Sequence, residues 1–221
     1  MSGRRSNLLR ARTEPPALRG LLHEAAAVAV ALVCVPLAIA ADGPLATAAL
    51  TVHLVTLLVL LCTSAFYHRH APDDRVRRLA RRLDHAAIYG LIAGSYTPVL
   101  TLALEPWLGL PALVVVWAVA INSMSIKLRR LELGQERMHS WMYATLAGAA
   151  VVLLPWMVSS MGWATVGVIV AGGAVYLLGG LVLIARRPDP WPSTFGFHET
   201  WHLAVLIGAA LHLGVSVSLA T

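Results

Sequence analysis

Two histidines four residues apart, His198 and His202, open the last apolar stretch of the chain. On an α-helix this spacing places both side chains on one face, about 6 Å apart along the axis, close enough to hold one metal ion. The residues that follow, 203–211, are almost all apolar and are typical of a membrane helix. The pair therefore predicts metal chemistry at the surface of a bilayer.

The same residues also read H-E-x-x-H, the zinc-protease signature in which Glu199 is the general base. An intramembrane protease of this kind needs a third ligand, commonly an aspartate on another helix. Asp42 is expected on the opposite face of the membrane, and using Asp84 as a ligand leaves His68 without a role. We treat the protease as the weaker hypothesis.

The composition indicates a protein whose solvent is the bilayer. Of 221 residues, 58% are hydrophobic and 13% are charged, and the mean hydropathy is +0.72. A spanning helix needs about 20 apolar residues, which predicts an all-α bundle of seven transmembrane helices. Residues 1–20 are expected to form a basic cytoplasmic N-terminal arm, and residues 21–221 the transmembrane domain. The predicted spans are roughly 21–41, 45–68, 84–104, 108–126, 140–160, 163–185 and 198–219.

The basic residues predict the orientation of this bundle. All 17 Lys and Arg residues precede the first span or lie between spans two and three, four and five, or six and seven. The positive-inside rule then places the N-terminus in the cytoplasm and the C-terminus outside. Because the charges are spread over four membrane-flanking segments, we expect anionic lipids as partners and no nucleic acid. The first span is expected to act as its own insertion signal, without a secretory signal peptide.

Five polar residues are predicted to share one depth at the cytoplasmic face, where spans two, three and seven begin or end: Ser64, His68, Asp84, His198 and His202. Three histidines plus a water form the open tetrahedral site of a catalytic Zn²⁺. Asp84 is the candidate catalytic carboxylate, orienting the water or taking its proton, although an aspartate there could instead cap its helix. Ser64 could bond the attacked carbonyl or merely a backbone carbonyl one turn back.

This pattern, S-x-x-x-H followed by an aspartate at the next span and then H-x-x-x-H, resembles the CREST superfamily, which includes alkaline ceramidases and the progestin and adiponectin receptors. The local strings are closer to its bacterial hemolysin III branch. The strings that carry the resemblance are residues 64–68, 83–89, 93–98, 198–202 and 205–212. The resemblance implies a seven-helix fold with zinc on three histidines near the cytoplasmic face of the bacterial inner membrane. One departure is the Arg-rich arm, where bacterial relatives often carry an acidic motif; His23-Glu24 is the candidate remnant.

The resulting hypothesis is a zinc-dependent hydrolase of a lipid amide or ester, with membrane lipids and a lipid-like substrate or ligand as partners. The alternative is a lipid sensor or membrane-homeostasis regulator with a structural zinc. His53 and His212 are expected about 22 Å and 15 Å along their helices from the site histidines, too far to join them. His85, His139 and Glu24 are interpreted as interfacial or packing residues, and the substrate and oligomeric state are not predicted.

Overall fold

The computed structural model describes residues 16–132 and 141–221, and these residues form helices joined by short loops. Outside the helices, the described residues contain one isolated antiparallel bridge, between Trp191 and Phe195, and no strand. The predicted all-α class is therefore confirmed. In chain order the elements are α2 (Leu21–Ala40), α3 (Gly43–Ala65), the π-helix η1 (Phe66–His70), α4 (Asp74–Pro98), the π-helix η2 (Val99–Ala103), α5 (Pro106–Glu132), α6 (Trp141–Gly148), the 3-10 helix η3 (Ala149–Leu153), α7 (Leu154–Ala185) and α8 (Phe197–Ala220).

Within the described residues, 6 helical stretches are long and apolar enough to cross a membrane. Five of them match predicted spans, although α4 begins earlier than expected. The sixth, Met142–Ala185, is 44 residues long and contains both the fifth and the sixth predicted spans. Its backbone leaves the helical region at Gly162, with φ 77° and ψ 165°.

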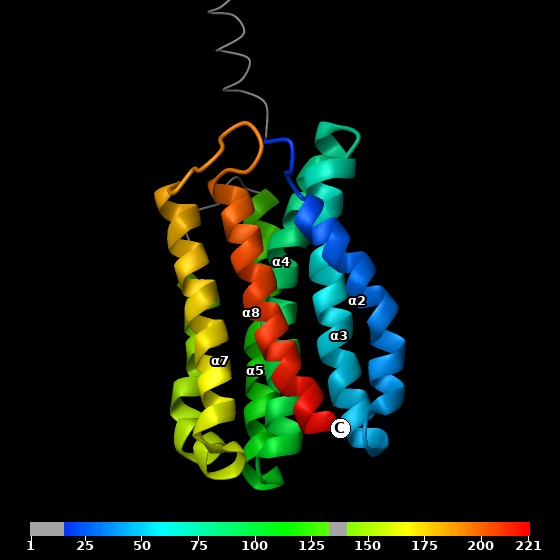
Figure 1. Cartoon of the computed structure of the whole chain (residues 1–221), viewed down its shortest axis with the longest axis vertical. Coiled ribbons are helices and arrows are strands. Elements are labelled where there is room, and N and C mark those ends of the chain that lie inside the picture. Colours follow the sequence, from blue (N-terminus) through cyan, green and yellow to red (C-terminus); the bar gives the residue numbers. More distant parts are fainter. Residues whose placement is uncertain (1–15, 133–140) are drawn as a thin grey trace, which may run out of the picture.

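The long helices lie side by side along the long axis of the molecule, with α8 between α7 and α3 (Figure 1). Both α2 and α8 begin at one end of this bundle, and the C-terminus lies at the opposite end (Figure 1). There the backbone N–H of Asp42, in the turn between α2 and α3, donates to the carbonyl of Ala220 at 2.7 Å. At the other end, the rings of His23 in α2 and His202 in α8 are in contact, so the starts of the two helices are neighbours although they are far apart in sequence.

Large apolar side chains cover the outside of the bundle. Ile39 in α2 is 78% exposed, Trp163 in α7 is 79% exposed and Ile184 near its end is 78% exposed. A protein surrounded by water rarely exposes continuous apolar surface of this kind, because its contact with water is unfavourable. The outer surface is consistent with contact to lipid chains.

Small residues bring α7 and α8 close together. A Cβ on Gly172 would lie 2.6 Å from Nε2 of His212, and a Cβ on Gly208 would lie 2.8 Å from the ring of Tyr176. Both distances are shorter than any van der Waals contact, so a larger residue would push the helices apart. Helices in membranes commonly associate through small residues in this way, and here the packing fixes the helix that carries His198 and His202.

The start of α4 corrects one sequence prediction. The span was predicted from residue 84, but α4 begins at Asp74, and the side chain of Asp73 caps it by accepting a hydrogen bond from the Val76 N–H at 2.8 Å. Residues 74–83 are rich in arginine, which lowers their hydropathy but favours helix formation. Asp84 therefore lies inside the helix, and the alternative in which it caps a helix is wrong.

Candidate metal centre

The first turn of α8 carries the pair that opened the sequence argument. Gly196 precedes the helix, and its N–H donates to Oε2 of Glu199 at 2.8 Å, which satisfies one of the free donors at the helix start. His198 and His202 then point to the same side, with ring centroids 4.6 Å apart. The geometry expected from the i, i+4 spacing is present.

A π-helical turn places the third histidine. After α3 ends at Ala65, residues 66–70 form η1, which has more residues per turn than an α-helix and rotates the side chains that it carries. Within this turn His68 faces α8, and its Nε2 lies 3.3 Å from Nε2 of His198. Its ring centroid is 5.0 Å from that of His202. The predicted S-x-x-x-H pattern assumed a continuous α-helix, so the π-turn was missed.

One ligand atom from each of His68, His198 and His202 lies within 4.8 Å of the others, and no other group of this kind occurs in the part of the chain that the structure describes. Zinc binds imidazole nitrogen at about 2.0–2.1 Å in tetrahedral geometry, which separates two ligand nitrogens by about 3.3 Å. The 3.3 Å between the Nε2 atoms of His68 and His198 matches this value. His202 Nδ1 is buried without a hydrogen-bond partner among the described residues. The donor set therefore fits zinc, and whether the protein binds it stays a prediction.

Ser64 and Asp84 lie beside this cluster. Ser64 is buried near the end of α3, two residues before η1, and its Oγ is 2.8 Å from Nδ1 of His23. The carboxylate of Asp84 interacts with the Ser64 hydroxyl and with His85, whose Nδ1 is 3.5 Å from Oδ2 of Asp84. The two candidate catalytic residues are thus adjacent to each other and to the histidines. Their role in a reaction stays a prediction.

Residues 16–24, here called the N-terminal segment, lie against the cluster and were not predicted as part of it. The N–H groups of Ala17 and Leu18 donate to the carbonyls of Ser193 and Thr194 at 3.0 and 3.1 Å, which ties the segment to the loop before α8. A Cβ on Gly20 would lie 2.7 Å from the Cβ of His68.

Glu24, the last residue of the N-terminal segment, binds the residues that follow His68. Its carboxylate pairs with Nε of Arg69 at 2.6 Å and with Nε2 of His70 at 2.8 Å, the two residues that follow His68. The His23-Glu24 pair had been interpreted as a remnant of an acidic motif, with Glu24 interfacial. In the structure His23 contacts Ser64, which precedes η1, and Glu24 contacts Arg69 and His70, which lie within η1.

Glu199 has no free oxygen to act as a general base. Its Oε1 pairs with the guanidinium of Arg19 and its Oε2 accepts from Gly196, and the residue is 1% exposed. A protease base must reach a water at the metal, so this geometry removes the feature that favoured the protease. Glu199 is instead a buried, paired residue in the first turn of α8.

The remaining histidines have other partners. His85 bonds the Arg81 carbonyl at 2.8 Å, while His139 lies outside the described residues. His53 Nδ1 is 2.8 Å from Ser216 Oγ, and His212 Nε2 donates to the Ile169 carbonyl at 3.0 Å. Neither His53 nor His212 belongs to the three-histidine group.

Comparison with known proteins places the whole site in one family. A family model described as Haemolysin-III related matches residues 12–213. Hemolysin-3 of Bacillus cereus is 31% identical over 170 residues, which cover 75% of this chain and 72% of that protein. The Hemolysin-3 homolog of Bacillus subtilis (strain 168) is 28% identical over 163 residues, 72% of this chain and 71% of that protein. The family match extends from before the N-terminal segment to beyond the histidine pair of α8.

Proposed function

Because this chain belongs to the Haemolysin-III related family of membrane proteins, we propose that it is a zinc-dependent hydrolase of a lipid amide or ester at the cytoplasmic face of the bacterial inner membrane. The observation that carries the proposal is the convergence of His68, His198 and His202, with ligand atoms within 4.8 Å of one another. Three protein ligands leave a fourth tetrahedral position, which is the arrangement of catalytic rather than structural zinc sites.

The proposal includes seven spans with the N-terminus in the cytoplasm. A continuous helix over the 44 residues of Met142–Ala185 would be about 66 Å long, twice the hydrocarbon thickness of a bilayer. The non-helical backbone of Gly162 supports two crossings, 142–161 and 163–185. An odd number of crossings agrees with the start of α2 and the end of α8 lying at opposite ends of the bundle (Figure 1), and the distribution of basic residues supports a cytoplasmic N-terminus.

The chain's own residues would orient the reaction. When bound, zinc would polarise the substrate carbonyl and activate a water for attack on it. Asp84 would take the proton of that water and return it to the leaving nitrogen or oxygen as the C–N or C–O bond breaks, giving a fatty acid and an amine or alcohol. Asp84 lies within electrostatic reach of His68 and His198, which supports this role. Ser64 would hold the carboxylate through its hydroxyl.

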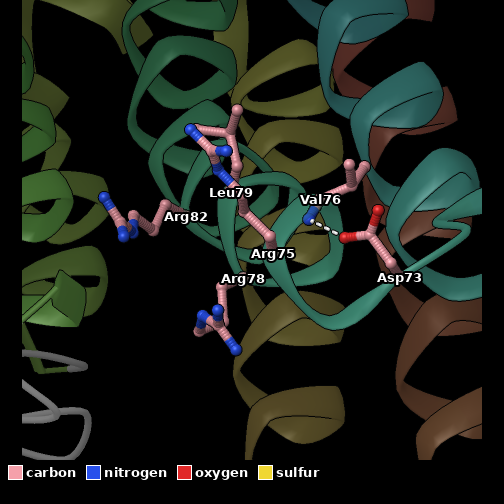
Figure 2. Close-up of a pocket in the computed structure, with 6 residues that line it drawn as sticks. All are labelled: Asp73, Arg75, Val76, Arg78, Leu79 and Arg82. Atoms are coloured by element: carbon pink, nitrogen blue, oxygen red, sulfur yellow. Dashed lines mark hydrogen bonds between the residues drawn. The ribbon is translucent and has the colours of Figure 1, made fainter.

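The start of α4 supports membrane lipids as partners. An open pocket of about 580 Å³ is lined by Arg75, Arg78 and Arg82, which project from successive turns, together with Leu79, Val76 and the helix-capping Asp73 (Figure 2). Leu79 is 53% exposed. Guanidinium groups beside an exposed leucine suit the boundary where anionic headgroups meet acyl chains. A lipid surface would thus be held close to the end of the bundle that carries the histidines.

A non-enzymatic lipid sensor with a structural zinc is the second candidate. The observation that favours it is the N-terminal segment, which packs against two of the histidines, with Gly20 close to His68 and the ring of His23 stacked on that of His202. The two candidates share the metal site and differ in whether Asp84 takes part in bond breaking.

Metal analysis of the purified protein in detergent tests the site. Wild type and His212→Ala are expected to contain one zinc per chain, while His68→Ala and His202→Ala contain none. Unchanged zinc in both site variants would end the model. Asp84→Asn is expected to keep its zinc and lose hydrolysis of a panel of fatty-acid amides, ceramides and phospholipid esters. If zinc-loaded wild type cleaves no member of the panel, the hydrolase proposal is wrong and the sensor remains.

A further inference from the structure

His23 is a buried histidine at the metal centre that does not belong to the three-histidine ligand group. It lies in the first turn of α2 and is 3% exposed. Its ring stacks on that of His202, with centroids 4.0 Å apart and planes inclined by 9°. Its Nδ1 lies 2.8 Å from Ser64 Oγ. One side chain thus contacts both a predicted zinc ligand and a predicted catalytic residue.

The hydrogen bond to Ser64 sets the direction of the serine hydroxyl. A hydroxyl has one proton to donate, and the neighbouring carboxylate of Asp84 can only accept. The arrangement that satisfies all three groups has His23 Nδ1–H donating to Ser64, and Ser64 donating to Asp84. Nε2 of His23 would then be the unprotonated ring nitrogen, and it is buried without a partner among the described residues.

The stacked ring limits the motion of His202. Parallel rings at 4.0 Å are in van der Waals contact over their faces. His202 cannot rotate about its side-chain bonds without breaking this contact, and a ligand held in one rotamer loses less conformational entropy when it binds a metal. His23 therefore acts on the ligand itself as well as on the acid beside it.

We propose that His23 is a positioning residue of the metal centre: its Nδ1 orients Ser64 toward Asp84, and its ring holds His202 in the orientation that binds metal. The inference rests on the proposed zinc site. In this role α2 supplies a residue that orients a metal ligand without binding the metal itself. Loss of such a residue typically weakens metal binding by about 10–100-fold.

The experiment separates the two contacts by substitution. Phe at position 23 keeps a ring face but no polar atom, Asn keeps a donor near the position of Nδ1 but no ring, and Ala keeps neither. The zinc dissociation constant is measured by competition with a chelator, and the visible spectrum of the cobalt-substituted protein reports the ligand geometry. His23→Ala is expected to weaken zinc binding about 10–100-fold and change the cobalt spectrum, and His23→Phe to recover most of the affinity. At saturating zinc, lipid hydrolysis should be recovered by His23→Asn and not by His23→Phe.

The matched control is His53→Ala. His53 is 0% exposed and its Nδ1 is also 2.8 Å from a serine Oγ, that of Ser216, but it touches none of the predicted ligands. Its loss should leave the zinc dissociation constant unchanged. Equal affinity in wild type and His23→Ala overturns the proposal, and so does an equal loss in His23→Ala and His53→Ala.

A metal-free measurement keeps this inference separate from the zinc model. In chelator-treated protein, the Tm shifts of His23→Ala and Ser64→Ala are expected to be non-additive in the double variant, because both remove the same hydrogen bond. Additive shifts overturn the positioning role whether or not zinc binds. A wild-type protein that binds no zinc, with non-additive shifts, would instead overturn the proposed function and leave the His23–Ser64 contact supported.

Discussion

Two buried histidine–serine pairs occupy different parts of this bundle. His23 and Ser64 join α2 to α3 beside the three-histidine cluster, and His53 and Ser216 join α3 to α8 elsewhere in the bundle. In both pairs a histidine Nδ1 lies 2.8 Å from a serine Oγ, and in both the histidine is at most 3% exposed. The pairs are chemically alike, so the surroundings decide what each can do.

The polar atoms around His53 do not converge on one point, and Nε2 of His53, like Nε2 of His23, is buried without a hydrogen-bond partner among the described residues. Ser216 Oγ also donates to the carbonyl of His212 at 3.0 Å, and Nε2 of His212 donates to the carbonyl of Ile169 at 3.0 Å. Beside His23, one ligand nitrogen from each of three further imidazoles lies within 4.8 Å of the others. Buried polarity in a membrane bundle therefore does not by itself mark a site; convergence of ligand atoms does.

Deleting a ligand should give the largest effect. His198→Ala is expected to lose essentially all zinc, a decrease in affinity beyond the 10–100-fold that typically follows loss of an outer partner. His212→Ala removes a histidine that bonds the Ile169 carbonyl and does not belong to the three-histidine group, so this variant should keep full zinc occupancy. Metal content after gel filtration checks both. Equal zinc in the two variants would remove the distinction between the two regions.

Breaking the buried ion pair should give the next largest effect. Arg19→Met leaves the carboxylate of Glu199, 1% exposed, without its guanidinium, and an uncompensated buried charge costs about 3–5 kcal/mol of stability. The double variant Arg19→Met with Glu199→Gln should recover most of the loss. Chemical denaturation in detergent measures both. A single variant as stable as wild type would show that the N-terminal segment does not hold the site.

Two glycines test whether the N-terminal segment contacts His68 in solution. Gly20 and Gly43 both have positive φ, at 77° and 86°, so alanine at either should cost about 1–2 kcal/mol. A Cβ on Gly20 would also meet His68 at 2.7 Å, whereas Gly43 has nothing within 4 Å. Gly20→Ala should therefore lose a further 1–3 kcal/mol or so and bind zinc more weakly. Identical behaviour of the two variants in thermal unfolding and zinc titration would refute the contact.

The smallest effect on stability is expected for the two serines. Ser64→Ala and Ser216→Ala each remove one hydrogen bond of a buried pair, at a cost of about 1 kcal/mol. Only Ser64→Ala should slow lipid hydrolysis, since only Ser64 interacts with Asp84. Tm values and hydrolysis rates of both variants measure the difference. A comparable loss of hydrolysis in Ser216→Ala would assign the effect to packing.

The sequence predicted the parts of the site that local spacing and membrane depth determine. His198 and His202 share a face because they are four residues apart on one helix, and His68 was found because it lies at the same depth. The helical class and most helix bounds followed from apolar stretches about 20 residues long. These are properties of short segments, or of the bilayer, and do not require knowledge of how the helices pack.

The parts that were missed depend on packing between distant segments. Arg19 lies in the predicted N-terminal arm, whose arginines indicated only the orientation of the bundle, and His23 lies just after that arm. No short-range sequence pattern pairs Arg19 with Glu199. The π-turn at residues 66–70 rotates its side chains about the helix axis relative to the positions expected for an α-helix with 3.6 residues per turn. The early start of α4 was hidden by low hydropathy. The signal that could have found His23 is its depth: like His68, it lies at the end of a predicted span that the basic residues predict to be cytoplasmic.

The Arg19–Glu199 pair joins residues 180 positions apart in the chain, and this separation has a consequence for synthesis in the cell. The segment that carries Arg19 and His23 is synthesised before the rest of the bundle, and α8, with two of the three histidines, is synthesised last. No truncated nascent chain can assemble the cluster. Metal binding, if it occurs at this cluster, would therefore add its free energy to the stability of full-length chains alone. It would distinguish full-length molecules from truncated ones.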